Sequence, residues 1–149
     1  MKAISLLQPW AQWVELGWKT VETRRHSRFA CLVGHAIVIH AAHKWDPDWI
    51  EKSKGLLTAA QFDETVEQCL HWHRGALLCT VRVVGHYQLG APASPLALCD
   101  CSDGRLFGLV IADVHRLAPT PFRGKQGIFE VPDEIICGNV EAKNEIWDE

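Results

Sequence analysis

The sequence predicts an α+β fold: a small closed β-barrel of five or six strands, with flanking helices and one helical insert. Extended apolar segments are joined by loops with few crossover helices, which argues against a doubly wound parallel sheet. Helical periodicity is concentrated in one long stretch, residues 46–73, between two of the strands. The chain of 149 residues is the size of one domain, and no repeat or linker divides it, so 1–149 is taken as a single domain.

The first third of the chain predicts a strand, a short helix and two further extended segments. Residues 2–7 (KAISLL) form the first strand, and Pro9 suits the first turn of the helix that follows. Gly17 can end that helix in a left-handed turn. Residues 18–25 are extended, and 35–42 (HAIVIHAA) are a β-branched apolar strand. Helical spacing on the first helix is shown by Trp10, Trp13 and Val14.

The helical insert carries its own start and stop signals. Asp46 is a good N-cap, Pro47 fits the first helical position, and Gly55 can stop the helix. Thr58 and Gln61 then have the spacing of a capping box. After the capping box, the residues Phe62, Val66, Cys69, Leu70 and His73 recur on one face of the predicted helix.

The last half of the chain predicts two long strands and one short one. Residues 76–89 form a strand bent at Gly85. A loop over 90–104 leads to a strand over 106–117, which Pro119 and Pro121 should break. The turn RGKQG (123–127) precedes the last strand, 128–132. A short helix should begin near Pro132, and the tail 139–149 is acidic and frayed.

Composition indicates a globular protein without bulk affinity for nucleic acid. Hydrophobic residues make up 48% and charged residues 22%, and the net charge is −3, so a protein that coats duplex backbone by charge is excluded. No signal peptide or membrane span is visible, which predicts a cytoplasmic location and no membrane partner. The cysteines are then expected as thiols, and Cys31, Cys69, Cys79 and Cys137 lie among apolar neighbours. With seven tryptophans, some should line a surface.

Three segments together resemble the ASCH domain family, the activating-signal-cointegrator homology domains. They are SLLQPWAQWVELGWKTVETRR (5–25), IVIHAA (37–42) and RGKQGIFEV (123–131). Most specific is the first, with Gln8-Pro9-Trp10, Gly17, Lys19-Thr20 and Glu22-x-Arg24. The resemblance implies a PUA-like barrel with a cleft beside the first helix, binding RNA or nucleotides. It also implies two activities found among members: removal of the acyl group from acetylated cytidine nucleosides, and ribonuclease activity.

The stretch 19–28 is the strongest basic cluster in an acidic chain. It holds Lys19, Arg24 and two further arginines against one carboxylate, Glu22. Arginine can grip a phosphate with two parallel hydrogen bonds. Since side chains alternate along an extended run, Glu22 and Arg24 share a face, where Glu22 could accept from a base amine or a ribose hydroxyl. The alternatives are a charged strand edge and a structural ion pair.

Catalysis by this cluster is what the resemblance implies. In the cytidine-deacylating relatives the position of Lys19 is catalytic. Those relatives have a threonine three positions after the lysine, and this chain has Glu22 there. They also use a glutamate from a later segment, but residues 80–89 of this chain contain no carboxylate.

Further candidates lie near the ends of the predicted elements. Trp10 could stack on a base, with a core role as the alternative. Gln8 precedes a helix start, where free N–H groups favour anions. His40, at the end of a strand, could be a general acid or base or a satisfied buried histidine. The other side of the pocket would be closed by Arg123, Lys125 and Gln126, in a turn whose glycines allow close backbone approach.

No metal or cofactor is predicted. The pairs Cys99-x-Cys101, His71-x-His73 and His40-x2-His43 lack the paired spacing of zinc sites, although the first could bind a soft ion. Phosphate loops and dinucleotide turns are absent from the sequence.

Three functions therefore stay open. The leading one is a module that binds RNA, single-stranded nucleic acid or a nucleotide with modest affinity, through Lys19, Arg24, Lys125, Glu22, Gln126 and Trp10. The second is a metal-independent hydrolase of a modified nucleoside or of RNA, with Lys19 or His40 as base. The third is a protein-interaction domain that uses the apolar face of the insert. The oligomeric state is not predicted.

Overall fold

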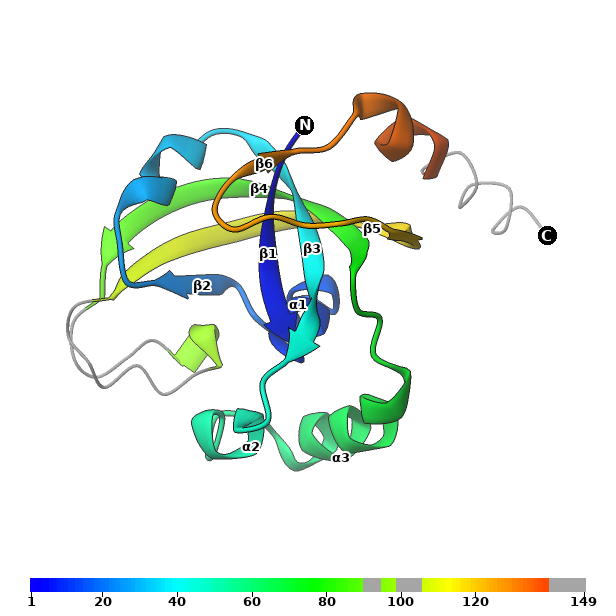
Figure 1. Ribbon diagram of the computed structural model, residues 1–149. Helices are drawn as coiled ribbons and strands as arrows, with labels where there is room; N and C mark the ends of the chain where they lie inside the picture. The colour runs from blue at the N-terminus through cyan, green and yellow to red at the C-terminus, as the bar shows by residue number, and fades with distance from the viewer. Residues whose placement is uncertain (90–94, 99–105, 140–149) are drawn as a thin grey trace.

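The computed structural model describes residues 1–89, 95–98 and 106–139. In these ranges six strands form one mixed sheet in the order β2-β5-β4-β3-β1-β6, with helices at its margins (Figure 1). The strands are β1 (Lys2–Gln8), β2 (Val21–Arg24), β3 (Ala36–Trp45), β4 (Ala76–Gln88), β5 (Phe107–Pro121) and β6 (Phe129–Glu130). The helices are α1 (Trp10–Glu15), α2 (Trp49–Lys52) and α3 (Ala59–Gln68), with 3-10 turns η1 (Arg28–Leu32), η2 (Cys69–His71) and η3 (Pro95–Ala97). The predicted α+β class is confirmed, and residues 133–139 form the helix expected after Pro132.

The predicted closure of the barrel is not confirmed, because the ladder of the described strands ends at β2 and β6. The four residues of β2 pair only with β5, and the two residues of β6 pair with the first residues of β1. Between β2 and β1 the link is a side chain: the Arg24 guanidinium donates to the Ser5 carbonyl oxygen at 2.8 Å. This hydrogen bond lies between the two strands where a closed barrel would have a ladder of backbone hydrogen bonds.

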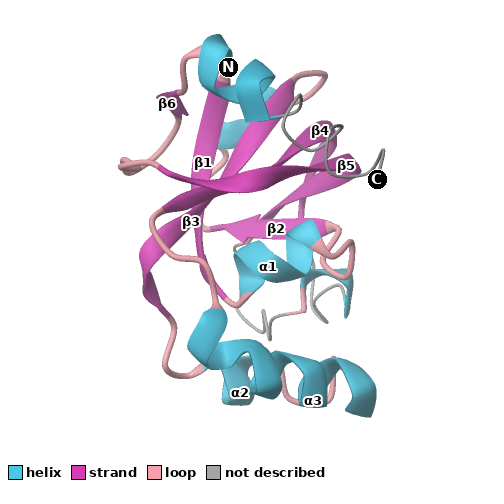
Figure 2. Cartoon of the chain, turned by 90° about the vertical axis from the view of Figure 1, so that its right-hand side faces the viewer, coloured by secondary structure: helices cyan, strands magenta, loops and turns pink. Residues whose placement is uncertain are grey.

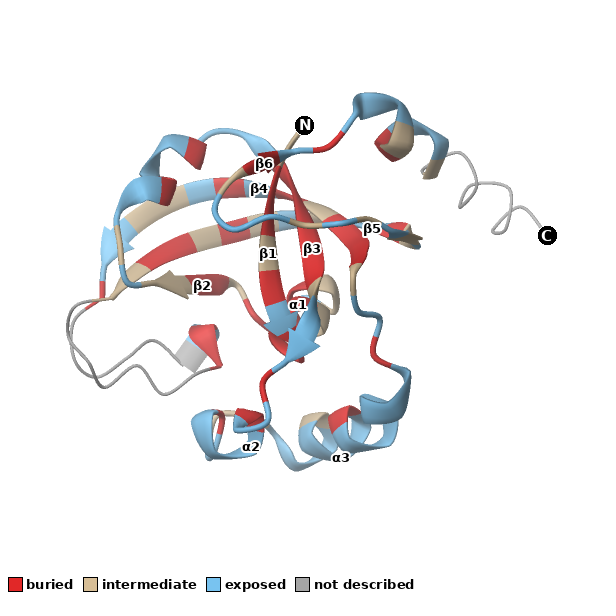
Figure 3. Ribbon diagram, viewed as in Figure 1, coloured by how far each residue is buried: buried red, intermediate tan, exposed pale blue. Residues whose placement is uncertain are grey.

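The central strands β1 and β3 are parallel and carry the core on both faces. Residues 37–41 of β3 are all buried, which explains their nearly continuous apolar sequence (Figure 3). Alternate residues face opposite sides of a strand. Ile37 and Ile39 therefore join the large cluster that packs with α1, whereas Val38 joins a second cluster with Phe129.

The prediction that Pro119 and Pro121 break the strand was wrong. β5 continues through both prolines to Pro121, which pairs with Ala76 of β4. A proline cannot donate to a ladder, but an unpaired strand edge tolerates it. The pairing of β5 with β2 ends at Val110, so the far half of β5 has such an edge. The expected irregularity of β4 is confirmed as a shift of register between Val83 and Gly85.

A chain of tryptophans fixes the helical insert to α1. Trp13 contacts Trp10 and Trp49 edge to face, with ring centroids 5.7 and 6.0 Å apart. Trp49 contacts Trp72 in the same way at 5.7 Å, and Trp72 contacts Trp45 at 6.0 Å. Only Trp45 of these five is exposed, at 45%. The helices of the insert thus form a layer beyond α1 (Figure 2).

The local signals at the end of α1 and in the insert are largely confirmed. Thr58 and Gln61 form the reciprocal capping box, and Gly17 and Gly55 have the positive φ values of left-handed stops. The predicted start at Asp46–Pro47 was wrong, since α2 begins at Trp49. The Asp46 carboxylate instead accepts from the Asp48 backbone N–H at 2.8 Å and forms a turn before the helix.

The apolar face of α3 does not enter the core. Phe62 and Val66 of α3 are exposed, and so is Leu70 of the following η2, at 90%. Thr65 is the buried residue of the helix, and its hydroxyl accepts from Trp13 Nε1 at 3.1 Å. α3 therefore contacts the rest of the domain through Thr65 and through the Phe62 ring, which lies 5.9 Å from the Trp49 ring, while Val66 stays exposed.

Among the described helices, none combines the length and apolar character needed to cross a bilayer. The four described cysteines, Cys31, Cys69, Cys79 and Cys137, are not joined in disulfides, and only Cys79 is buried.

Candidate functional site

The parallel register of β1 and β3 places Ser5 directly beside His40. Both side chains lie on the face of the second apolar cluster, because Ala3 and Val38, two residues before each of them, belong to it. Ser5 Oγ is 2.8 Å from His40 Nδ1. His40 Nε2 is 2.7 Å from the Phe122 carbonyl oxygen. The imidazole is thus held at both ring nitrogens, once by β1 and once by the segment after β5.

This pair lies at the floor of a hollow of about 740 Å³. The hollow is open to solvent along the turn that follows β5, where Arg123 and Lys125 are exposed. The ten described residues that line it include two cations and two histidines but no carboxylate. They are Ser5, His40, Ala42, His43, Gly75, Pro121, Phe122, Arg123, Gly124 and Lys125. In a chain with net charge −3, this is a local concentration of positive charge suited to an anionic ligand.

Close packing fixes the turn that carries the cations. The Phe122 N–H donates to the Gly75 carbonyl oxygen at 2.9 Å, which ties the turn to the start of β4. A Cβ added to Gly124 would lie 2.5 Å from His40 Cε1 and 2.7 Å from Ser5 Oγ. Only glycine therefore lets the backbone between Arg123 and Lys125 approach the serine and the histidine so closely.

Burial controls the charge of His40. The side chain is 3% exposed, and burial lowers its pKa below the ordinary value of 6.5, partly opposed by the hydrogen bond to Phe122. The Phe129 ring packs edge to face against it at 5.7 Å. The imidazole is therefore neutral at neutral pH.

This neutral, buried histidine predicts a loss of stability in mild acid. Below pH 6.5 the histidine of the unfolded chain becomes protonated, whereas His40 in the folded chain stays neutral until the pH falls to its lower pKa. Between these two pKa values the unfolded chain binds more protons, so the free energy of unfolding rises with pH. Urea denaturation between about pH 5 and pH 7.5 should show a weaker pH dependence in His40→Gln than in the wild type. Equal pH dependence in both proteins would show that His40 is not the group responsible.

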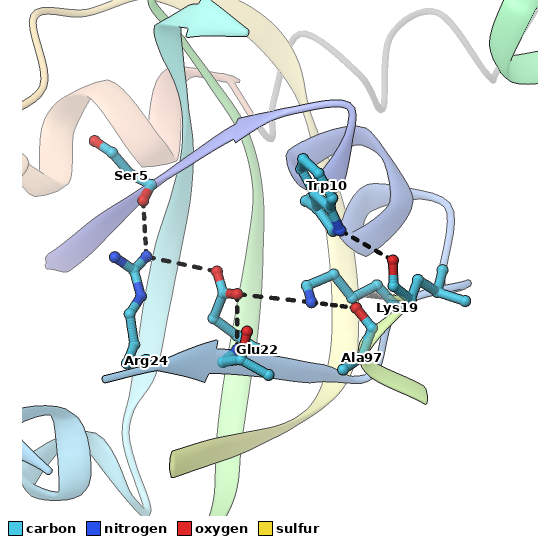
Figure 4. A network of polar contacts seen from close by, with 8 residues as sticks. Ser5, Trp10, Lys19, Glu22, Arg24 and Ala97 are labelled. Carbon is cyan, nitrogen blue, oxygen red and sulfur yellow. Dashed lines mark hydrogen bonds and ion pairs between the residues drawn. The ribbon is translucent and has the colours of Figure 1, made fainter. Parts of the chain in front are cut away.

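Of the basic cluster predicted to hold phosphate, Lys19 and Arg24 form an internal network with Glu22 (Figure 4), whereas Arg25 and Arg28 are exposed. Lys19 is 1% exposed; its Nζ donates to the Ala97 carbonyl oxygen at 2.6 Å and lies 3.6 Å from Glu22 Oε1. Glu22 Oε2 lies 3.5 Å from an Arg24 nitrogen, and the Arg24 guanidinium lies 4.9 Å from the centre of the Phe29 ring. These three side chains connect β2 to η3, β1 and η1, so their polar groups contact other parts of the protein.

Gln8 and Trp10 also have partners within the protein. The Gln8 side chain accepts from the Gln12 N–H at 2.9 Å and donates to the His73 carbonyl oxygen at 2.7 Å. Gln8 itself is therefore the partner of this N–H group in the first turn of α1. Trp10 is 8% exposed and donates to the Leu98 carbonyl oxygen at 3.1 Å. Stacking of Trp10 on a base would require the segment that carries Leu98 to move.

The structure thus divides the predicted site residues into two groups. His40, Arg123 and Lys125 meet in the hollow, and Gln126 is exposed on the same turn without lining it. The others lie around α1 and β2: Gln8, Trp10, Lys19, Glu22 and Arg24. Ser5, Phe122 and Gly75 were missed, and only the parallel pairing of residues 2–7 with 37–42 could have pointed to Ser5.

A separate, apolar groove of about 380 Å³ lies on the helical insert. Its lining residues are Trp45, Trp49, Ile50, Val66, Cys69, Leu70, Trp72 and Arg74. The protein-interaction function stays a prediction, and this groove is the surface that it would use.

No group of three metal-ligating side chains occurs among residues 1–89, 95–98 and 106–139. The Cys99-x-Cys101 pair lies outside the described residues.

Comparison of the sequence with models of known families found no match, nor did comparison with curated proteins. Solved structures do match. The crystal structure of ASCH from Zymomonas mobilis has a TM-score of 0.57 and 14% identity, covering 94% of this chain and 93% of that one. A serine-to-alanine variant of the Zymomonas mobilis protein gives a TM-score of 0.59 and 15% identity, covering 95% and 94%. The chain therefore has the fold of these ASCH proteins, as the sequence resemblance predicted.

Proposed function

We propose that this chain, which has the ASCH fold, binds RNA, single-stranded nucleic acid or a nucleotide through the hollow between β3 and the turn 122–125. The observation that carries the proposal is the composition of that hollow. Arg123 and Lys125 stand at its rim, and no described lining residue is acidic. Arginine and lysine on an exposed turn are free to contact phosphate oxygens, whereas Lys19 and Arg24 are already bonded within the fold.

The floor of the hollow suits a base or a sugar. The half-buried Phe122 ring offers an apolar surface for stacking, and the exposed His43 lies at the edge. Gly75 and Gly124 line the hollow with backbone alone, and Gly124 packs closely against His40 and Ser5. With two cations, the site would hold one or two phosphates. Few phosphate contacts give modest affinity and do not require a long duplex.

A hydrolase that uses Lys19 as its base is less well supported. The Lys19 Nζ donates to a backbone carbonyl and faces a carboxylate. Both contacts occupy the amino group within the fold, and the side chain is 1% exposed, so Lys19 is not presented to a substrate.

The test is the affinity of Arg123→Ala/Lys125→Ala for a short single-stranded RNA and for adenosine 5′-monophosphate. The wild type should bind the RNA with micromolar affinity, and log K should fall with log salt by about 0.7 for each neutralised phosphate. The double variant should bind at least about tenfold more weakly and lose most of that salt dependence.

The matched control is Lys54→Ala/Arg82→Ala, which removes the same two charges from exposed positions outside the hollow. It should retain at least about half of the wild-type affinity, because distant surface charges act only through a screened field. Equal losses in both double variants would mean that net charge, and not this hollow, governs binding.

A further inference from the structure

Ser5, His40 and Phe122 have the geometry of a nucleophile, its base and the group that orients the base. A carbonyl oxygen only accepts hydrogen bonds, so the contact of 2.7 Å to Phe122 places the imidazole proton on Nε2. His40 Nδ1 is then an acceptor, and the Ser5 hydroxyl, at 2.8 Å, donates to it. Serine hydrolases also bond a hydroxyl to an imidazole whose other nitrogen is fixed by a third group; here the two ring nitrogens are exchanged and a backbone carbonyl replaces the carboxylate.

The surroundings keep this base neutral and within reach of a ligand. The aromatic rings of Phe122 and Phe129 pack against His40, and the charged or titratable groups that share the hollow are His43, Arg123 and Lys125. The positive charges of Arg123 and Lys125 favour negative charge on a reacting oxygen. Ser5 itself is partly exposed and lines the hollow.

We propose that Ser5 is a nucleophile activated by His40, and that the chain hydrolyses carboxylic esters that carry an anionic group. The inference rests on the proposed function in one respect, that the same hollow admits an anionic ligand. Arg123 and Lys125 hold the anionic group, and the ester carbonyl lies over Ser5.

The step is an ordinary acyl transfer. Ser5 Oγ bonds to the ester carbonyl carbon while its proton passes to His40 Nδ1. The bond from that carbon to the alcohol oxygen breaks, and the departing alcohol takes the proton from His40. Water then attacks the acyl-serine ester, His40 takes a proton from the water and returns it to Ser5 Oγ, and the carboxylic acid leaves. No oxidant, metal or co-reactant other than water is consumed.

Covalent labelling separates this role from a merely structural hydrogen bond. A fluorophosphonate should add to the wild-type chain at one site, which peptide mass spectrometry should map to Ser5. Ser5→Ala should not be labelled, and Ser27→Ala, which removes an exposed serine outside the hollow, should be labelled as the wild type is.

Turnover of two 4-nitrophenyl esters completes the test. The succinate half-ester, which keeps a free carboxylate, should be hydrolysed faster than the acetate, and Arg123→Ala/Lys125→Ala should abolish that preference. Ser5→Ala should lower the rate about 100-fold or more. The wild-type rate should stay constant down to the ordinary histidine pKa of 6.5 and fall only below it, as burial lowers the pKa of His40.

Absence of an adduct at Ser5, or equal ester hydrolysis by Ser5→Ala and the wild type, would overturn the inference. If adenosine 5′-monophosphate binds while Ser5 stays unlabelled, nucleophilic catalysis is wrong and the binding function stands. If Ser5 is labelled while neither nucleotide nor RNA binds, the binding function is wrong and the nucleophile stands.

Discussion

Replacing Lys19 with methionine should lower the free energy of unfolding by about 3–5 kcal/mol, although methionine nearly matches the lysine side chain in length. The lysine is 1% exposed and lies 3.6 Å from a Glu22 carboxylate that is itself almost buried. Its removal leaves that carboxylate with the Thr23 N–H at 2.8 Å and a distant Arg24 nitrogen at 3.5 Å. It also removes the donor that the Ala97 carbonyl oxygen accepts at 2.6 Å.

Urea denaturation followed by circular dichroism would measure this loss, with Lys54→Met as the exposed control. Adding Glu22→Gln to Lys19→Met should recover part of the stability, because the double variant no longer buries an unpaired charge. A change below about 1 kcal/mol in Lys19→Met would contradict the structural role of the network and would restore Lys19 as a candidate for ligand contact.

Substituting Gly124 with alanine should cost about 1–3 kcal/mol in stability and should weaken nucleotide binding and Ser5 labelling together. The new Cβ would lie 2.5 Å from His40 Cε1 and 2.7 Å from Ser5 Oγ, so the turn must move away from the floor of the hollow. That movement also shifts the cations that flank Gly124. The change is measurable as the urea midpoint and as the dissociation constant for adenosine 5′-monophosphate.

Gly138→Ala is the matched control for this substitution. A Cβ at Gly138 meets no atom within 4 Å, and the residue lies in the helical stretch 133–139. Alanine there should leave stability unchanged or raise it by up to about 1 kcal/mol. If Gly124→Ala were as harmless as Gly138→Ala, the close approach of the turn to Ser5 and His40 would be wrong.

Features of the fold that depend on residues close together in the sequence could be predicted. The capping box of Thr58 and Gln61 and the left-handed stop at Gly17 depend on residues a few positions apart, and both are confirmed. Pro119 and Pro121 misled the prediction because their effect depends on whether the strand has a neighbour on that side, which is a property of the sheet.

The site was harder to predict because tertiary contacts decide it. Ser5 and His40 are 35 positions apart and meet only through the parallel register of β1 and β3. Charge in the stretch 19–28 predicted an exposed binding surface, but the Ala97 carbonyl and Glu22 bury Lys19. Arg123 and Lys125 were predicted as site residues because the RGKQG turn belongs to the ASCH-like segments, and the structure brings both to the hollow with His40.

Both proposals for this chain require that an anionic ligand occupies the hollow lined by Arg123 and Lys125. The most direct measurement is a titration of the isotope-labelled chain with adenosine 5′-monophosphate, followed by the backbone amide resonances. Binding in the hollow should produce saturable shifts at Gly75, Gly124 and Lys125. Shifts confined to residues 19–24, or no saturable shift at all, would contradict it.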